Sequence, residues 1–414
     1  MSPLLVVLLL ALIGLLGAQL GFPQRRVPLG PQIFIAVGGP FLFIGFILGP
    51  HLLQVLSFRT VTQLTPMLAL GLGWIGLLFG LQLDRDHLRR FPSRYLILAW
   101  LQAGIAFCIV FLLGYLVTDA WLSLRLDAIL LVAAATACVS TPAAIALISN
   151  TYQTRGRVTR LLFFVASLDA AVGVVALGLV HAGFNTGLLG RGGLLSSAEL
   201  FLISILLGCF FGVLFLSLTR VRPRSQELLL LLIGLVLFAA GTSFYLALSP
   251  LFVCMVAGVV IGNLSPMRRR VYTALSSWEK PIYIIMLVLA GALLQFSSWW
   301  IVPLVLAYIG TRILAKWLGG VLAAKLPIPG AAVPSSFGLA LTPQGGLSLA
   351  IAISFVLIYN PVGEIGSAES VLLATVVIAV GVSDLIGPFL VRDVLGRAGE
   401  LGRGAVSTAA HETR

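Results

Sequence analysis

The segments CVSTPAAIAL (residues 138–147) and LTPQGGLSLA (residues 341–350) each interrupt a long apolar run. Proline removes a backbone donor and clashes with the preceding helical turn, and paired glycines weaken a helix further. One Thr-Pro kink is most often structural, but two kinks in different halves of a chain indicate a functional element. We therefore expect two broken helices, interrupted at Ser140, Thr141, Pro142 and at Thr342, Pro343, Gln344, Gly345, Gly346.

The composition around these segments is that of a membrane protein. Of the 414 residues, 59% are hydrophobic and only 10% are charged, whereas soluble domains carry about 25% charged residues. This balance excludes a soluble enzyme, a nucleic-acid-binding protein and a disordered chain. The four cysteines lack CxxC spacing and the four histidines are scattered. No catalytic pair, no cofactor and no metal other than a transported monovalent cation is therefore expected.

Apolar runs of about 20 residues are long enough to cross a bilayer. They predict an all-α polytopic membrane protein with about 13 transmembrane helices. The first run lacks a basic leader and a small-residue cleavage site, so we interpret it as a retained span and not a signal peptide. The predicted spans cover residues 3–20, 31–49, 62–83, 95–117, 124–149, 158–182, 196–219, 226–247, 250–264, 273–297, 298–322, 333–358 and 368–392.

The placement of the basic residues predicts which way these spans face. With the C-terminus in the cytoplasm, 21 of the 26 Lys and Arg residues fall in cytoplasmic loops or in the C-terminal tail. The opposite loops hold only Arg59, Arg125 and Arg191. Cytoplasmic loops of membrane proteins are enriched in Lys and Arg. The N-terminus is therefore expected outside, and the net charge of +12 reflects topology and not a nucleic-acid partner.

Ionisable residues within the spans are the main candidates for function, because a charge in a membrane is costly. Asp169 lies near the middle of its span, with the small residues Ala166, Ala170 and Gly173 on the same helical face. Asp384 is less central and precedes a Gly-Pro break. The alternative for each acid is a hydrogen bond to a neighbouring helix, and this alternative carries more weight for Asp384.

Arg312 and Lys316 lie four residues apart and share one helix face. Two cations facing lipid would be very costly, so we expect them to point into the bundle and meet carboxylates or helix C-termini. One of them is expected to neutralise Asp169 when no cation or proton is bound. The alternative for Lys316 is that its side chain extends to the cytoplasmic edge of the membrane.

The two halves of the chain repeat one pattern. Each has a Thr-Pro-interrupted span followed by a span with an acid, and the two interruptions lie about 200 residues apart. By the predicted span count, the two interrupted helices run in opposite directions. This pattern indicates an inverted repeat with a binding site at the midplane between crossed broken helices.

These segments together resemble the monovalent cation/proton antiporter superfamily of bacterial sodium/hydrogen exchangers, and within it the branch related to glutathione-gated potassium efflux systems. The resemblance extends from about residue 31 to 395, nearly the whole chain. It rests on the order and spacing of FIGFILGPHLL, GWIGLLFGLQLDRDHLRR, STPAAIALI, SLDAAVGVV, LSPLFVCMVAGVVIGN, LTPQGGLSLA and TVVIAVGVSDLIGPFLVR.

The resemblance implies an inverted-repeat antiporter fold in which a core bundle moves against a dimerising scaffold bundle. Asp169 would be the essential carboxylate, reached alternately from each side. The implied parts are scaffold helices in 1–83, core helices in 95–182, a linking helix in 196–219, scaffold helices in 226–297, core helices in 298–395 and a disordered cytoplasmic tail in 396–414.

The resulting hypothesis is electroneutral exchange of Na⁺ or K⁺ for H⁺ at Asp169, with Ser140, Thr141 and broken-helix carbonyls as further ligands. The protein would act as a homodimer within the lipid of a bacterial inner membrane. Two departures from the family pattern leave open whether transport is altered or lost. Leu168 stands where many relatives have Asp or Asn, and Gln344 stands where many have Arg. Asp384 is a candidate for the missing acid.

Two other functions stay open at this point. The same fold could carry an anionic solute, with Arg312, Lys316 and helix N-termini as its site. Alternatively, the chain could be a non-transporting or sensor-like membrane subunit whose core has degenerated. Leu168 and Gln344 favour this last alternative, whereas Asp169 and the two Thr-Pro breaks oppose it.

Overall fold

Helices make up the ordered structure, with no β-strand among the residues that the structure describes. In this computed structural model these residues are 3–19, 38–50, 52–85, 91–121, 127–185, 195–220, 224–295, 301–325, 333–359 and 368–402. Several predicted features lie outside them. These are the span portions 20, 31–37, 124–126 and 296–300, the tail from residue 403, and the loop residues Arg25, Arg26, Arg89, Arg90, Arg125, Arg191 and Arg222.

Every predicted span contains a helix. The helices are α1 (Pro3–Gln19), α3 (Gly39–Leu48), α4 (Phe58–Gln63), α5 (Thr65–Gln82), α7 (Ser93–Trp121), α8 (Asp127–Cys138), α9 (Pro142–Tyr152), α10 (Arg157–Gly183), α11 (Ser197–Leu218), α12 (Ser225–Tyr245), α13 (Pro250–Leu264), α14 (Arg268–Ala292), α15 (Ile301–Lys325), the 3₁₀ helix η2 (Phe337–Leu341), α16 (Gly345–Tyr359) and α17 (Ala368–Arg397). Within the described ranges, eight helical segments are long and apolar enough to cross a membrane. The count of about 13 crossings stays a prediction.

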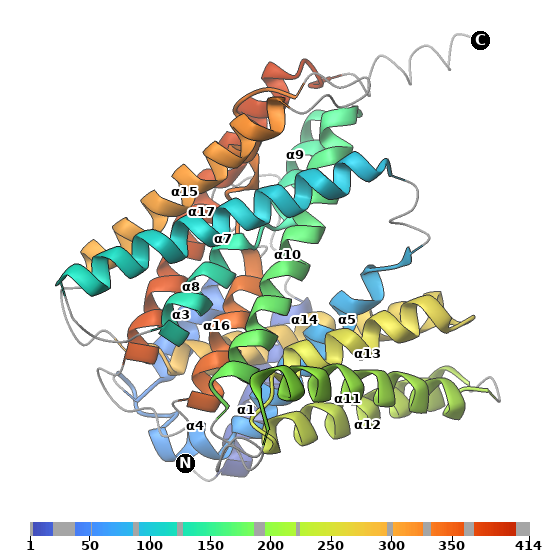
Figure 1. Cartoon of the computed structure of the whole chain (residues 1–414). Helices are drawn as coiled ribbons and strands as arrows, with labels where there is room; N and C mark the ends of the chain where they lie inside the picture. Colours follow the sequence, from blue (N-terminus) through green and yellow to red (C-terminus); the bar gives the residue numbers. More distant parts are fainter. Residues whose placement is uncertain are drawn as a thin grey trace.

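The helices fall into two groups, as Figure 1 shows. In one group α13 packs on α5 and α11, and α14 packs on α1 and α3. In the other group α7, α8, α10, α15, α16 and α17 pack on one another, together with α9 and η2. The groups meet where α10 contacts α11 and α13 and where α16 contacts α5.

Glycines bring α5 and α13 into direct backbone contact within the first group. A Cβ on Gly80 would lie 2.1 Å from the carbonyl oxygen of Met255, and a Cβ on Gly258 would lie 2.3 Å from that of Leu77. Small residues allow such close approach of helices in a membrane, where packing replaces the hydrophobic driving force. The glycines of GLGWIGLLFG and VAGVVIG therefore fix this crossing.

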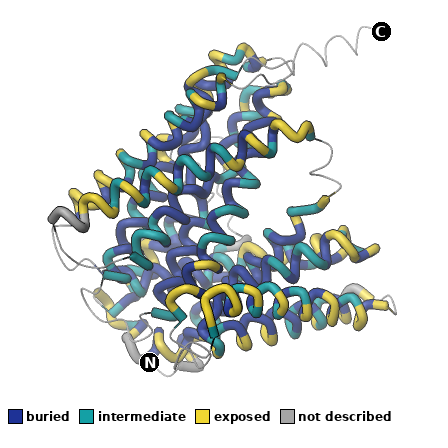
Figure 2. The backbone as a smooth tube through the Cα atoms, viewed as in Figure 1, coloured by how far each residue is buried: buried dark blue, intermediate teal, exposed yellow. Residues whose placement is uncertain are grey.

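The outer surface of the bundle is strongly apolar. Figure 2 shows buried residues along the interior and many exposed residues on the outer helices. Phe210 on α11 and Leu230 and Phe238 on α12 are 59%, 73% and 73% exposed. Apolar surface of this extent is not stable in water, but it is the expected surface towards the hydrocarbon core of a bilayer.

The beginning of the predicted tail is folded against the helix that carries Asp169. Glu400 is 4% exposed and accepts hydrogen bonds from the backbone N–H groups of Val158 and Thr159, both at 2.8 Å. It also accepts one from Thr159 Oγ1 at 2.7 Å. These groups belong to the first turn of α10, whose N-cap residue is Gly156 and has no side chain to cap it. Glu400 therefore supplies the N-terminal cap of α10 from a distant part of the chain.

We expect Glu400→Ala to lower the free energy of unfolding by about 2–3 kcal/mol, because it removes charge-assisted hydrogen bonds and leaves buried N–H groups unpaired. Thermal or denaturant unfolding of the detergent-solubilised protein measures this loss. Asp393→Ala is the matched control, since its ion pair with Arg397 is 50% and 61% exposed and is worth no more than about 1 kcal/mol. Equal losses in the two variants would contradict the capping role.

Candidate functional site

The two predicted breaks lie against each other in the interior. The helix α8 ends at Cys138 and α9 begins at Pro142, while η2 ends at Leu341 and α16 begins at Gly345. The Thr141 N–H donates to the Pro343 carbonyl at 2.9 Å. Ser140 Oγ donates to the Leu341 carbonyl at 3.0 Å. The structure therefore brings the two interrupted segments into direct contact.

The sequence around each break explains its local form. Pro142 occupies the first turn of α9, where its missing N–H costs nothing, and Thr141 Oγ1 accepts from Ala143 N as the N-cap. Gly345 has φ +67°, a conformation that favours glycine. A Cβ on Gly345 would also lie 2.7 Å from Thr141 Cβ. The glycine thus permits both the turn and the close approach of the two breaks.

Arg312 on α15 ties together the carbonyl ends of both broken helices. The residue is 1% exposed, and all the acceptors of its guanidinium among the described residues are backbone carbonyls. The acceptors are Ala137 at 3.2 Å, Val139 at 2.8 Å, Leu341 at 3.5 Å, and Thr342. Free carbonyls at a helix C-terminus carry partial negative charge. Arg312 therefore meets helix C-termini, as the sequence predicts, and does not contact Asp169.

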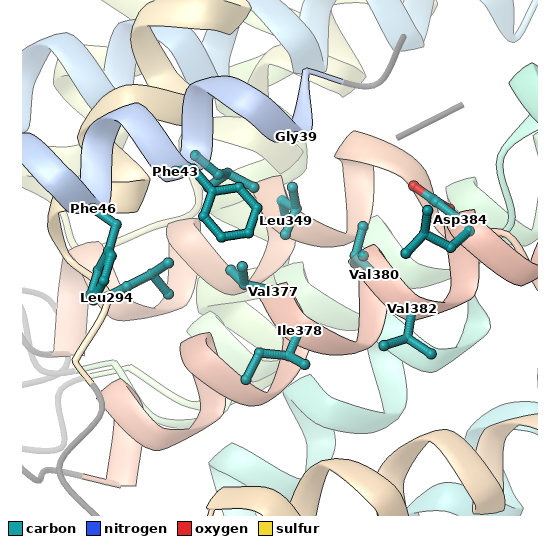
Figure 3. A pocket seen from close by; sticks show the side chains of 13 residues that line it. Gly39, Phe43, Phe46, Leu294, Leu349, Val377, Ile378, Val380, Val382 and Asp384 are labelled. Atoms are coloured by element: carbon teal, nitrogen blue, oxygen red, sulfur yellow. The ribbon is translucent and has the colours of Figure 1, made fainter. Parts of the chain in front are cut away.

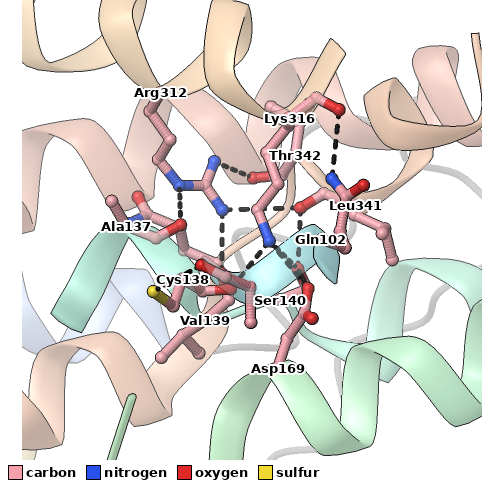
Figure 4. Close-up of polar contacts among 12 residues, drawn as sticks. Gln102, Ala137, Cys138, Val139, Ser140, Asp169, Arg312, Lys316, Leu341 and Thr342 are labelled. Atoms are coloured by element: carbon pink, nitrogen blue, oxygen red, sulfur yellow. Dashed lines mark hydrogen bonds and ion pairs between the residues drawn. The ribbon is translucent and has the colours of Figure 1, made fainter. Parts of the chain in front are cut away.

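Lys316 forms the ion pair with Asp169, one helical turn beyond Arg312. Its Nζ lies 2.7 Å from Asp169 Oδ2, 2.9 Å from Ser140 Oγ and 2.7 Å from the Cys138 carbonyl oxygen (Figure 4). The Lys316 side chain is fully buried. It therefore does not extend to the edge of the bundle, which was the alternative considered from the sequence.

Asp169 has one paired and one unpaired carboxylate oxygen. Oδ2 accepts from Lys316 and from Ser140 Oγ at 3.0 Å, whereas Oδ1 is buried and has no hydrogen-bond partner among the residues that the structure describes. The residue is 0% exposed, in the middle of α10. Gly173 lets α10 approach the first broken helix, since a Cβ there would lie 2.8 Å from the Ala135 carbonyl oxygen. An unpaired buried acceptor in a native structure calls for an explanation such as an ion or a function.

Asp384 lies at the second break and not at Asp169. Its Oδ1 accepts from Gln344 N at 3.0 Å and from Gly345 N at 3.3 Å. The carboxylate thereby caps the N-terminus of α16, where the helix dipole favours a negative charge. Arg312 and Asp384 thus compensate helix ends of opposite sign at the same crossing.

Gln344 joins a polar network that the sequence analysis missed. Its Nε2 donates to the Thr136 carbonyl at 3.2 Å and to Tyr308 Oη at 3.1 Å. Tyr308 Oη also lies 2.9 Å from Thr136 Oγ1. Tyr308 precedes Arg312 by four residues, so the shared helix face was a signal that could have identified it. Thr136, inside an apolar run, gave no such signal.

Gln102 on α7 was also missed, and it contacts the turn of α15 that carries Lys316. Its Nε2 donates to the Lys316 carbonyl at 3.0 Å, and the residue is 1% exposed. Gly338 packs on the same carbonyl, since a Cβ there would lie 1.7 Å from the Lys316 oxygen. Two neighbouring elements therefore hold this turn in place from different directions.

At the crossing of the two breaks, the buried charges are compensated, and some buried oxygen atoms have no hydrogen-bond partner among the described residues. Among the residues that the structure describes, no cluster of His, Cys, Asp and Glu could hold a metal ion. Buried oxygens without partners do occur at the breaks, on Asp169 Oδ1, Thr342 Oγ1 and Gln344 Oε1. Oxygen atoms of this kind are ligands for hard cations. The chemistry available at the crossing is therefore binding and exchange of small cations and protons.

Comparison with known families agrees with this chemistry. The family model described as "Sodium/hydrogen exchanger, transmembrane" matches residues 8–395. The chain belongs to this family. It is accordingly a multi-pass membrane protein and a secondary transporter that exchanges a cation for protons, not an enzyme. No curated protein sequence matches it.

Solved structures show the same fold. The sodium proton antiporter MjNhaP1 from Methanocaldococcus jannaschii at pH 8 aligns with a TM-score of 0.66 and 16% identity, over 96% of this chain and 100% of that one. A second structure of MjNhaP1, from electron microscopy, aligns with a TM-score of 0.61 and 17% identity, over 96% and 97%. The exchanger shares the antiporter fold with these proteins.

Proposed function

We propose that the exchanger carries Na⁺ or K⁺ against H⁺ by alternating access at a single carboxylate, Asp169. The observation that carries the proposal is the state of this side chain. It is 0% exposed at the crossing of the breaks, with Oδ2 paired to Lys316 and Oδ1 without a partner. A transported cation would take the place of the Lys316 ammonium on Asp169 and use the unpaired oxygen as well.

One-for-one exchange follows from the charges around Asp169. The Asp169–Lys316 pair has no net charge, and Leu168 supplies no second acid beside it. A monovalent cation that binds Asp169 adds one positive charge to the site. The net charge of the site is unchanged if one proton leaves at the same time, either from the Asp169 carboxyl group or from the displaced Lys316 ammonium. The moving helices then carry the same charge in both directions, which avoids moving an uncompensated charge through low dielectric. The proposed cycle is therefore electroneutral.

Further ligands in this proposal are Ser140, Thr141 and the carbonyls of the breaks. Ser140 Oγ lies 3.0 Å from Asp169 Oδ2 and is well placed to remain in contact. Thr141 caps α9 through its hydroxyl and contacts the second break through its N–H. Thr342 adds a buried hydroxyl oxygen without a partner. Arg312, Pro142, Pro343, Gln344, Gly345 and Gly346 would hold the breaks in register, and Asp384 would cap α16.

The experiment that tests this proposal is a cation scan in proteoliposomes. A trapped pH dye reports proton movement after addition of Li⁺, Na⁺, K⁺ or Rb⁺, with protein-free liposomes as the control. We expect saturable alkalinisation or acidification with Na⁺ or K⁺, at a rate that does not change when a membrane potential is imposed. A rate that rises with the potential would contradict electroneutral exchange, and no response to any of the cations would contradict the assignment of transport.

The proposed orientation places the N-terminus outside and the C-terminus in the cytoplasm of a bacterial inner membrane. Its support is the division of basic residues, 21 on one side against three on the other. We also propose that α1, α3, α5 and α12 to α14 form the scaffold, through which a homodimer forms, and that α11 is the linking helix. The group containing α7 to α10 and α15 to α17 would be the moving core, because it carries the breaks, Asp169 and Lys316.

The contacts of the cations weigh against an anionic substrate. Arg312 donates to four backbone carbonyls and Lys316 is paired with Asp169, so neither is free to bind an anion at the crossing. The Gln344 position does not indicate a degenerate core either. Its backbone N–H and its side-chain Nε2 both donate hydrogen bonds, and Asp384 beside it accepts from two backbone N–H groups.

A further inference from the structure

A cavity lies apart from Asp169, between the two groups of helices. It has a volume of about 420 Å³, within the range of about 300–1,000 Å³ that is usual for small-molecule sites. Its walls come from α3 on one side and from α16 and α17 on the other, with Leu294 just after α14. Figure 3 shows Phe46 and Leu294 towards one end and Asp384 at the other. The cavity is elongated, apolar along its length and acidic at one end.

Asp384 is the one charged residue among those that line the cavity. It is 1% exposed, and both backbone hydrogen bonds that it accepts end on Oδ1. Among the described residues it forms no ion pair. Arg312 attracts the carboxylate electrostatically, but its guanidinium is hydrogen-bonded to backbone carbonyls and not to Asp384. The carboxylate at this end of the cavity therefore has backbone N–H groups as hydrogen-bond partners, but no cation among the described residues is in direct contact with it.

We infer that this cavity binds an amphipathic organic monocation, with an ammonium head at Asp384 and an apolar body along Phe43, Phe46 and Val380. Charge complementarity selects this occupant. A neutral hydrocarbon chain would bury the carboxylate further without compensating it, which costs free energy. An ammonium group supplies both the counter-charge and a hydrogen-bond donor for the carboxylate, and such charge-assisted bonds are the strong ones.

A ligand in this cavity would also affect transport. This step rests on the proposed alternating movement of the two groups of helices. The helix α3 packs on α14 in the first group, whereas α17 packs on α15, α16 and η2 in the second. A ligand between α3 and α17 contacts both groups at once. It would stabilise the arrangement seen here and slow any relative movement of the two groups. The organic monocation is therefore expected to inhibit exchange without competing at Asp169.

Binding of 1-naphthylmethylammonium to the full-length protein in nanodiscs tests the inference directly, with 1-naphthylmethanol as the neutral isostere. We expect saturable binding of the cation at least about tenfold tighter than that of the alcohol. Asp384→Asn removes the charge but keeps an amide oxygen that can accept the two backbone hydrogen bonds. It should weaken cation binding at least about tenfold and leave binding of the alcohol unchanged.

Two further variants place the ligand. Phe43 is 61% exposed, so Phe43→Ala should fold normally and weaken binding of both compounds by removing a wall of the cavity. Asp169→Asn should leave binding of the cation unchanged, even though the proposed function predicts that it does not transport. Loss of binding in Asp169→Asn, equal affinity for cation and alcohol, or retention of full affinity in Asp384→Asn would each overturn the inference. Because the readout is binding, failure of the transport proposal would not produce any of these results.

Discussion

Asp169→Asn is expected to abolish Na⁺-dependent proton movement in proteoliposomes, reducing it to the level of protein-free liposomes. The substitution keeps the volume of the side chain and an oxygen that can accept from Ser140 Oγ, which now lies 3.0 Å from Oδ2. It removes the negative charge that pairs with the Lys316 ammonium at 2.7 Å. An amide takes up neither a proton nor a strongly held monovalent cation in the physiological range, so both halves of the exchange lose their site.

The measurement compares initial rates of the pH-dye signal after a Na⁺ jump, with K⁺ jumps run in parallel. Asp393→Asn is the matched control, since it removes one carboxylate charge from an exposed ion pair at the end of α17. That variant should retain the wild-type rate. Exchange at the wild-type rate in Asp169→Asn would show that Asp169 is not the carrier and would place the coupling acid elsewhere in the chain.

The sequence carried enough information to predict the breaks and the buried charges. Proline and paired glycines act on the chain locally, so Pro142, Pro343 and Gly345 identify interrupted helices without any tertiary contact. The cost of a charge in hydrocarbon is similarly general, which is why Asp169 and Lys316 could be selected from their positions within predicted spans. Helix periodicity then placed Arg312 on the same face as Lys316.

Which cation pairs with Asp169 could not be predicted, because it depends on the relative positions of helices that are far apart in the sequence. Arg312 and Lys316 were equal candidates as partners of Asp169, and one helical turn decides between them. The second break also differs in form from a broken long helix. In the described stretch from residue 333 to Thr342 the chain forms only the short helix η2, in which Gly338 packs directly on the Lys316 carbonyl. The cap that Glu400 supplies to α10 was equally hidden, in a segment predicted to be a disordered tail.

The ion pair itself is tested by Lys316→Met, which is expected to lower the free energy of unfolding by about 3–5 kcal/mol. Methionine has a similar length, so little space is left empty. The Asp169 carboxylate, however, would keep only the Ser140 hydroxyl as a donor in a fully buried position. Removing one partner of a buried pair is costly for this reason, whereas replacing both partners is often close to neutral.

Adding Asp169→Asn to Lys316→Met should therefore recover most of the lost stability, because the uncompensated charge is gone. Denaturant unfolding of the wild type, the two single variants and the double variant closes a thermodynamic cycle that isolates the pair. Arg397→Met is the matched control. It removes a cation from an ion pair whose side chains are 61% and 50% exposed, and it should cost less than about 1 kcal/mol. A loss in Lys316→Met no larger than in this control, or additive losses in the double variant, would mean that the Asp169–Lys316 contact does not hold the core in this arrangement. Recovery of stability in the double variant would instead show that Lys316 stabilises the core while no transported cation is bound. In the proposed cycle, the cation has to displace Lys316 from Asp169.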